Sequence, residues 1–155
     1  MNKFEQLVDD LQNGTGMARS KAAAELGKLR DKKASGFLIK ALADANGSVR
    51  SNAAFALAEL GEKTAVPYLI ETLKDTEEWT RKSAAKALGL LTAKEAVAPL
   101  KKLMDDASFT VRKNAIRSLG QIGGPEAMES LLHASAGQDE VVAHLAKEAI
   151  KNIKA

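Results

Sequence analysis

The chain has 155 residues, of which 45% are hydrophobic and 28% are charged, and its formal net charge is +3. This composition is that of a globular protein, and the small positive charge is weaker than the dense basic stripe of strong nucleic-acid binders. Cysteine is absent, which excludes disulfides and cysteine-ligated metal sites. No apolar run approaches 18 residues and the N-terminus lacks a signal peptide's apolar core, so we expect a cytoplasmic protein without membrane contact.

A block of sequence recurs five times along the chain. It reads ARSKAAAELGKLR from Ala18, VRSNAAFALAELG from Val49, TRKSAAKALGLLT from Thr80, VRKNAIRSLGQIG from Val111 and, in degenerate form, VAHLAKEAIKNIK from Val142. The interval is 31 residues each time, a period typical of stacked helical repeats. We therefore predict a single array over residues 1–155, with a half-repeat at 1–17, repeats at 18–48, 49–79, 80–110 and 111–141, and a capping helix at 142–155.

The recurring block predicts the first helix of each unit. Its apolar residues are spaced by four and then three positions, which places them on one stripe of an α-helix. One column is alanine in every copy: Ala22, Ala53, Ala84, Ala115 and Ala146. A second column is also small: Gly27, Ala58, Gly89 and Gly120. We expect a neighbouring helix to pass close to both columns.

A shorter apolar stripe follows each block and predicts a second helix. Its residues are Leu38 and Leu42, then Val66, Leu69 and Leu73, then Val97, Leu100 and Met104, then Met128 and Leu131. A similar stripe, formed by Phe4, Leu7 and Leu11, precedes the first block. No segment shows the two-residue period of a strand. The sequence therefore predicts an all-α fold, an α-solenoid (α-α superhelix) of 31-residue helical hairpins with about ten helices.

An arginine near the start of each block follows a polar residue by six positions. The pairs are Asn13 and Arg19, Asp44 and Arg50, Asp75 and Arg81, and Asp106 and Arg112. In the last unit, Gly137 and Ala143 replace both residues together. Joint loss indicates that the two residues contact each other, so we predict a structural Asp–Arg ladder that holds successive units in register.

The hairpin period, the Asp-x5-Arg spacing, the VRxxAAxALG-like first helices and the second-helix segments AVPYLIETL and AVAPLKKLM resemble HEAT repeats. More narrowly they resemble the class called PBS-lyase HEAT-like (E-Z type) repeats. That class contains phycobilin lyase subunits, deoxyhypusine hydroxylase and plain adaptors. The hydroxylase holds two irons with repeated His-Glu pairs, but here Ala134 follows His133 and Leu145 follows His144. We therefore expect no such activity.

Motifs for catalysis are missing from the sequence. HExxH, a phosphate-binding loop, GxSxG and a dinucleotide fingerprint are all absent. We expect a non-enzymatic protein with no catalytic residue, metal or cofactor. A surface for a protein or peptide partner then remains as the candidate site.

The resemblance implies that the second helices line the concave side of the solenoid. The residues expected to face a partner there are Phe37, Lys40, Tyr68, Glu71, Thr72, Lys102, Ser130 and His133. In a chain with only 4% aromatic residues, Phe37 and Tyr68 in one column are candidate anchors for a partner. The alternative is that both rings fill gaps between neighbouring units.

Three functions stay open on the sequence. The first is a scaffold or adaptor that binds a protein or peptide on its concave face. The second, implied by the resemblance alone, is a phycobilin-lyase-like or chaperone-type subunit acting on a cofactor-bearing protein. The third is weak nucleic-acid binding through Lys40, Lys101 and Lys102, which the net charge of +3 disfavours. Lys147 and Lys151 replace small residues in the inter-unit columns of the last unit, so we expect no further unit there and a monomer.

Overall fold

The computed structural model describes residues 1–154. Over this range the chain forms ten α-helices and no strand: α1 (Lys3–Asn13), α2 (Gly16–Leu29), α3 (Ser35–Ala41), α4 (Gly47–Glu59), α5 (Val66–Thr72), α6 (Glu78–Leu90), α7 (Val97–Leu103), α8 (Phe109–Ile122), α9 (Gly124–Ser135) and α10 (Glu140–Lys154). Short 3-10 turns at Lys32–Ala34, Lys63–Ala65 and Lys94–Ala96 lead into α3, α5 and α7. The predicted all-α repeat fold is confirmed.

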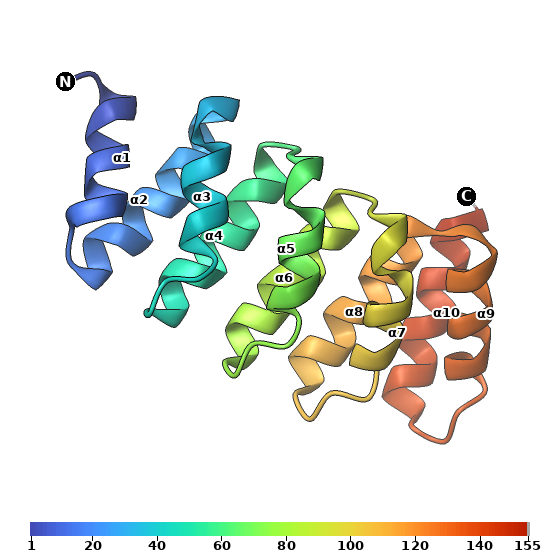
Figure 1. The fold of residues 1–155 in the computed structure, drawn as a ribbon. Coiled ribbons are helices and arrows are strands. Elements are labelled where there is room, and N and C mark those ends of the chain that lie inside the picture. Colours follow the sequence, from blue (N-terminus) through green and yellow to red (C-terminus); the bar gives the residue numbers. More distant parts are fainter. Residues whose placement is uncertain (155) are drawn as a thin grey trace.

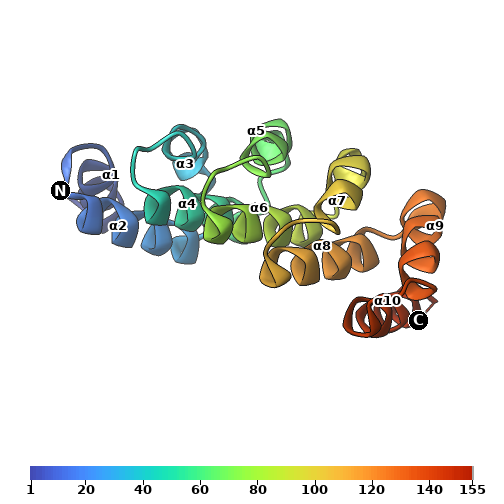
Figure 2. The same cartoon turned by 90° about the horizontal axis from the view of Figure 1, so that it is seen from below.

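The helices lie in two rows (Figure 1). The inner row consists of α2, α4, α6, α8 and α10, each packed on the next, and the outer row consists of α1, α3, α5, α7 and α9, which are more widely spaced. Figure 2 shows that the array bends toward the inner row, most strongly at α9 and α10. The expectation that the second helices line the concave side is therefore wrong. The helices of the recurring block lie there, because they pack more closely.

Small side chains explain the close packing of the inner row. The five alanines of the invariant column are all buried. A methyl group at Gly27 would lie 2.8 Å from Cβ of Ala56 on the next helix, and one at Gly120 would lie 3.0 Å from Cβ of Ala149. At Gly89 it would collide with the side chain of Ser118. These columns bring successive inner helices into backbone-level contact, as expected from the sequence.

Each outer helix packs against the inner helix that follows it in the chain. The contacting pairs are α1 with α2, α3 with α4, α5 with α6, α7 with α8 and α9 with α10. The repeat boundaries placed before residues 18, 49, 80 and 111 separate an outer helix from its own partner. In the described residues, α1 pairs with α2 and α10 pairs with α9, so both ends of the array lie within helical hairpins.

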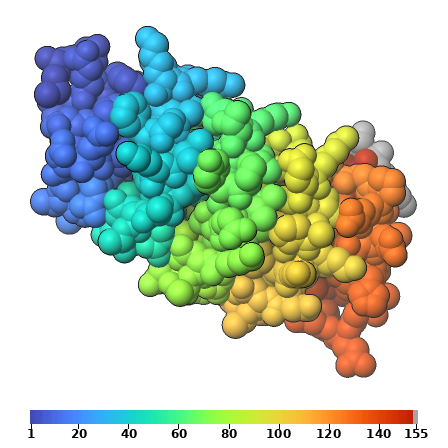
Figure 3. Space-filling view, viewed as in Figure 1, coloured from blue at the N-terminus to red at the C-terminus, as the bar shows by residue number. Residues whose placement is uncertain are grey.

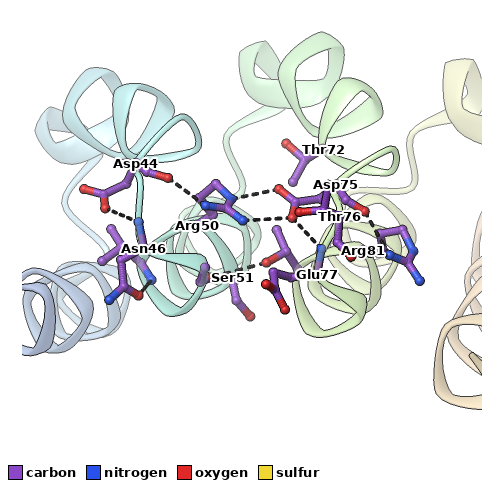
Figure 4. A network of polar contacts seen from close by, with 12 residues as sticks. Asp44, Asn46, Arg50, Ser51, Thr72, Asp75, Thr76, Glu77 and Arg81 are labelled. Atoms are coloured by element: carbon purple, nitrogen blue, oxygen red, sulfur yellow. Dashed lines mark hydrogen bonds and ion pairs between the residues drawn. The ribbon is translucent and has the colours of Figure 1, made fainter.

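Arginines at the starts of inner helices form ion pairs with carboxylates of the next hairpin. Arg50 donates from Nε to Oδ2 of Asp75 at 2.8 Å and from Nη2 to Oδ1 at 2.9 Å (Figure 4). The same two-pronged contact joins Arg19 to Asp44 and Arg81 to Asp106. Paired hydrogen bonds of this kind fix both distance and orientation.

The register of this ladder differs from the expected one. For Arg50, Arg81 and Arg112, the aspartate six residues earlier offers its backbone: Nη1 of Arg50 donates to the carbonyl oxygens of Asp44 (2.8 Å) and Ala45 (3.2 Å). Nη1 of Arg19 donates instead to the carbonyl oxygen of Gly14. The carboxylate comes from the aspartate 25 residues further along. Each aspartate also stabilises its own turn: Oδ1 of Asp75 accepts a hydrogen bond from the backbone N–H of Glu77.

The ladder lowers the pKa of its three aspartates. For Asp44 the hydrogen bond from Arg19 is the largest influence on the pKa, and burial opposes it. For Asp75 and Asp106 burial is the largest influence and raises the pKa, but hydrogen bonds from the arginine and from a backbone N–H, together with the attraction of two nearby arginines, outweigh it. The three carboxylates are only 12% to 15% exposed, so solvent screens these pairs less than surface pairs.

The turns after α2, α4, α6 and α8 share a column of residues at positive φ. The four residues of this column are Arg30 (53°), Gly61 (64°), Thr92 (48°) and Gly123 (70°). After α8 the next residue, Gly124, also has positive φ (87°). Glycine adopts this conformation freely, whereas a side chain with a Cβ atom costs about 1–2 kcal/mol there. The β-branched Thr92 is the least suited of the four.

We predict that Thr92→Gly raises the free energy of unfolding by about 1 kcal/mol, because it relieves this strain. Urea denaturation of the purified variant measures the change. The reciprocal variant Gly61→Thr should lose a similar amount. A Thr92→Gly variant no more stable than the wild type would show that the turn is unstrained.

The ladder also predicts how stability depends on pH. Because the folded pKa values of Asp44, Asp75 and Asp106 lie below the unfolded value of about 3.9, their contribution is complete above that value. It is lost as the pH falls through the lowered folded values. Asp75→Asn should lower stability at neutral pH and make the loss toward pH 2 shallower, as measured by urea denaturation at a series of pH values.

Asp105→Asn is the matched control, since Asp105 is exposed and makes no ion pair within residues 1–154. It should keep the wild-type pH dependence. Identical pH profiles for Asp75→Asn and the wild type would contradict a stabilising role for the ladder.

Candidate functional site

The described residues hold no group of three or more side chains that could bind a metal ion. Within the same part of the chain, every helix is too short or too polar to cross a membrane. The two rows of helices form two surfaces.

The residues expected to face a partner lie on the outer, convex row. Lys40, Tyr68, Glu71, Lys102 and His133 are exposed there, on α3, α5, α7 and α9. Phe37 on α3 is half-buried and packs against the core. Figure 3 views the molecule from this side, with the outer helices facing the reader.

Two of the expected residues do not reach the surface. Thr72 is 8% exposed and donates its hydroxyl hydrogen to the carbonyl oxygen of Tyr68 at 2.8 Å. Ser130 is 3% exposed and donates to the carbonyl oxygen of Glu126 at 3.1 Å. Both hydroxyls are satisfied within their own helices, so the expectation that they face a partner is corrected.

The remaining outer residues do not form one site. Phe37 and Lys40 line a shallow groove between α1 and α3. Lys102 lines a different groove of about 460 Å³ between α5 and α7, together with Ile70 and Pro99. Tyr68 is 54% exposed and lines neither groove. The bend separates the outer helices, so the two aromatic rings proposed as anchors are divided between separate ridges.

The inner row carries a cluster of aromatic and basic side chains. Trp79, at the start of α6, is 58% exposed, and Nζ of Lys82 lies 5.0 Å from the centroid of its ring. Nζ of Lys86 lies 5.2 Å from the centroid of the Phe55 ring on α4. Cations at these distances are attracted to the faces of the rings, which orients both lysines.

Two further cations extend this cluster onto α8. Lys113 and Arg117 lie one repeat beyond Lys82 and Lys86 and therefore occupy equivalent positions on the next inner helix. None of the four makes an ion pair with a carboxylate of residues 1–154. The basic–aromatic patch is the name used below for this set: Phe55, Trp79, Lys82, Lys86, Lys113 and Arg117.

Hollows flank the basic–aromatic patch on both sides. Toward the N-terminus, a polar groove of about 470 Å³ is lined by Ser20, Ser51, Asn52 and Trp79, among others. Its walls are tied together, because Nδ2 of Asn52 on α4 donates to Oγ of Ser20 on α2 at 2.8 Å. Toward the C-terminus, Arg117 and Glu148 line a smaller hollow between α8 and α10. The groove, the patch and the hollow together involve all five inner helices, from α2 to α10.

A sequence signal for this patch exists. Lys82 and Lys86 are four residues apart on a helix, and the same spacing recurs as Lys113 and Arg117. The spacing places all four on one face of adjacent helices. The signal was missed because the surface was assigned to the other helix of each unit.

Comparison with known proteins shows which family and which solved structures this chain is similar to. The family model for HEAT repeats matches residues 4–88, 36–108 and 69–151. An engineered protein is similar in structure, with a TM-score of 0.74 and 24% identity over 99% of this chain and 80% of its own. A designed armadillo repeat protein in complex with the peptide (KR)4 has a TM-score of 0.72 and 23% identity over 97% of this chain and 81% of its own. No curated protein matches in sequence.

The complex of CpcE and CpcF of phycocyanin lyase from Nostoc sp. PCC7120 is also similar, with a TM-score of 0.58 and 24% identity over 100% of this chain and 78% of its own. At this identity, each structural likeness shows the fold alone. The three overlapping matches to the family model jointly reach from residue 4 to residue 151, and the chain therefore belongs to the HEAT-repeat family.

Proposed function

We propose that this chain is a non-enzymatic binding scaffold that holds an acidic peptide segment of a partner protein on its inner face. The observation that carries the proposal is the basic–aromatic patch, with four cations on two adjacent helices and no ion pair to a carboxylate within residues 1–154. The concave face remains the binding surface of the hypothesis, but the helices that form it are those of the recurring block.

Charge and rigidity both favour an acidic ligand. Lys82 and Lys86 are already oriented over aromatic rings, so pairing them with carboxylates orders little additional side-chain freedom. Closely packed helices hold the patch in place. Complementary charge raises the association rate and selects among partners, even where each exposed pair adds little affinity.

The shape of the inner face supports an extended segment. The patch continues into the polar groove beside α2 and α4 and into the hollow between α8 and α10. A related use of this architecture is the designed armadillo protein, which was solved with the basic peptide (KR)4. The inner face here is basic, so complementarity calls for the opposite charge in its ligand.

The two alternative functions, a lyase-like role and nucleic-acid binding, require different features of the chain. The likeness to the CpcE and CpcF complex supports the fold and brings no activity to this chain, so the lyase-like role stays a prediction from resemblance. Nucleic-acid binding would use the same cations, but a long polyanion favours a basic stripe longer than four side chains.

Charge reversal on the two rows tests the proposal. We predict that Lys86→Glu combined with Arg117→Glu weakens binding of a fluorescein-labelled octaglutamate peptide about tenfold or more, since two exposed pairs become repulsions. Fluorescence anisotropy at fixed ionic strength measures the dissociation constant. The matched control is Lys40→Glu combined with Lys102→Glu, which changes the net charge equally on the outer row and should have a much smaller effect.

Equal weakening by both double variants would contradict the proposal, because attraction would then depend on net charge alone. Greater weakening by the outer-row variant would return the site to α3 and α7. Tighter binding of an oligothymidylate than of octaglutamate would favour the nucleic-acid alternative. A shifted absorbance band on adding a bilin would favour the lyase-like one.

A further inference from the structure

The Asp–Arg ladder ends on an arginine without a carboxylate. Arg19, Arg50 and Arg81 each bind the aspartate 25 residues further along. Arg112 occupies the same position at the start of α8, but the residue 25 positions beyond it is Gly137. The array therefore contains three filled carboxylate receptors and a fourth of the same design.

Arg112 is oriented like its paired counterparts. Its Nη1 donates to the carbonyl oxygens of Asp106 at 2.8 Å and Ala107 at 3.2 Å. Arg81 makes the same two contacts, to the carbonyl oxygens of Asp75 and Thr76. The guanidinium of Arg112 is thus anchored at one end, and its Nε and Nη2 donors have no partner among residues 1–154.

The residues around Arg112 leave its Nε and Nη2 donors accessible to a ligand. Because Arg112 is half-buried, leaving these donors unpaired costs free energy. The guanidinium lies 5.6 Å from the centroid of the Phe109 ring, which is 43% exposed, and Gly137 is exposed. Arg112 itself is half-buried, so water satisfies its donors less completely than those of a free surface arginine. Asp139, two residues after Gly137, already accepts hydrogen bonds from the backbone of Val141 and Val142 at the start of α10.

We propose that Arg112 is a receptor for a carboxylate supplied by a partner molecule, either an acidic side chain or a C-terminal carboxylate. The partner's carboxylate takes the place that Asp75 takes on Arg50, with one oxygen on Nε and the other on Nη2. This site lies at the start of α8 and uses none of the residues of the basic–aromatic patch, so it stands or falls independently of the proposed function.

Nitrogen-15 NMR of the arginine Nε–H groups tests the receptor directly, with sodium acetate as the probe and chloride holding the ionic strength constant. The Arg112 signal should shift and saturate as acetate is added. The signals of Arg19, Arg50 and Arg81 should not shift, because an aspartate already binds the Nε and Nη2 donors of each. Arg30 is the exposed control and should show only the small linear drift of an unspecific contact. An Arg112 response no stronger than that of Arg30 would overturn the proposal.

Completing the ladder provides a second, independent test. Gly137→Asp should move the Arg112 Nε–H signal toward those of Arg50 and Arg81, abolish its acetate response and raise the melting temperature above that of Gly137→Ala. The alanine variant is the matched control, since a Cβ atom at this position lies 3.2 Å from the carbonyl oxygen of Ala134 in both variants. An intact acetate response in Gly137→Asp, with the melting temperature of Gly137→Ala, would also overturn the proposal.

Two peptides distinguish the sources of the carboxylate. One contains a single aspartate and has an amidated C-terminus, and the other has a free C-terminus and no acidic side chain. Saturation of the Arg112 signal by either peptide supports the receptor and assigns its source. A response to neither peptide would overturn recognition of a partner chain.

Discussion

The close approach of the inner-row helices is the constraint on which the rest of the structure depends. Gly27, Gly89 and Gly120 lie against the next helix with no room for a methyl group, and the alanine column beside them is fully buried. Helices that approach this closely on one side must spread on the other, so the array bends and the outer helices separate (Figure 2). The bend makes the recurring block, with its exposed lysines, the concave surface.

The Asp–Arg ladder adds register to this spacing. Helix packing through small residues is tolerant of sliding, whereas a two-pronged contact such as that between Arg50 and Asp75 fixes one hairpin relative to the next. Each arginine also binds the backbone of its own turn, so a single side chain connects two hairpins (Figure 4). The same geometry that is structural in three places becomes a candidate recognition site where the aspartate is replaced by Gly137.

The sequence was sufficient for the helices, the period and the small-residue columns, because each depends on residues close together in one helix. It was not sufficient for the partner of Arg50, because Asp44 and Asp75 are both aspartates in equivalent turns and only the stacking of hairpins decides between them. The prediction of which row is concave was wrong for a similar reason. Which helix of a hairpin lies inside depends on the relative spacing of the two rows, and that spacing is a property of the assembled array.

The spacing of the two rows is the most direct measure of the bend. The chain has no cysteine, so pairs of spin labels can be attached at introduced cysteines and their separation measured by double electron–electron resonance. One pair replaces Lys86 and Glu148 on the inner row, and the other replaces Glu71 and His133 on the outer row; both pairs are exposed and 62 residues apart. The bend toward the inner row predicts a shorter distance for the inner pair. Equal distances, or a shorter outer pair, would contradict the bend and the inner surface derived from it.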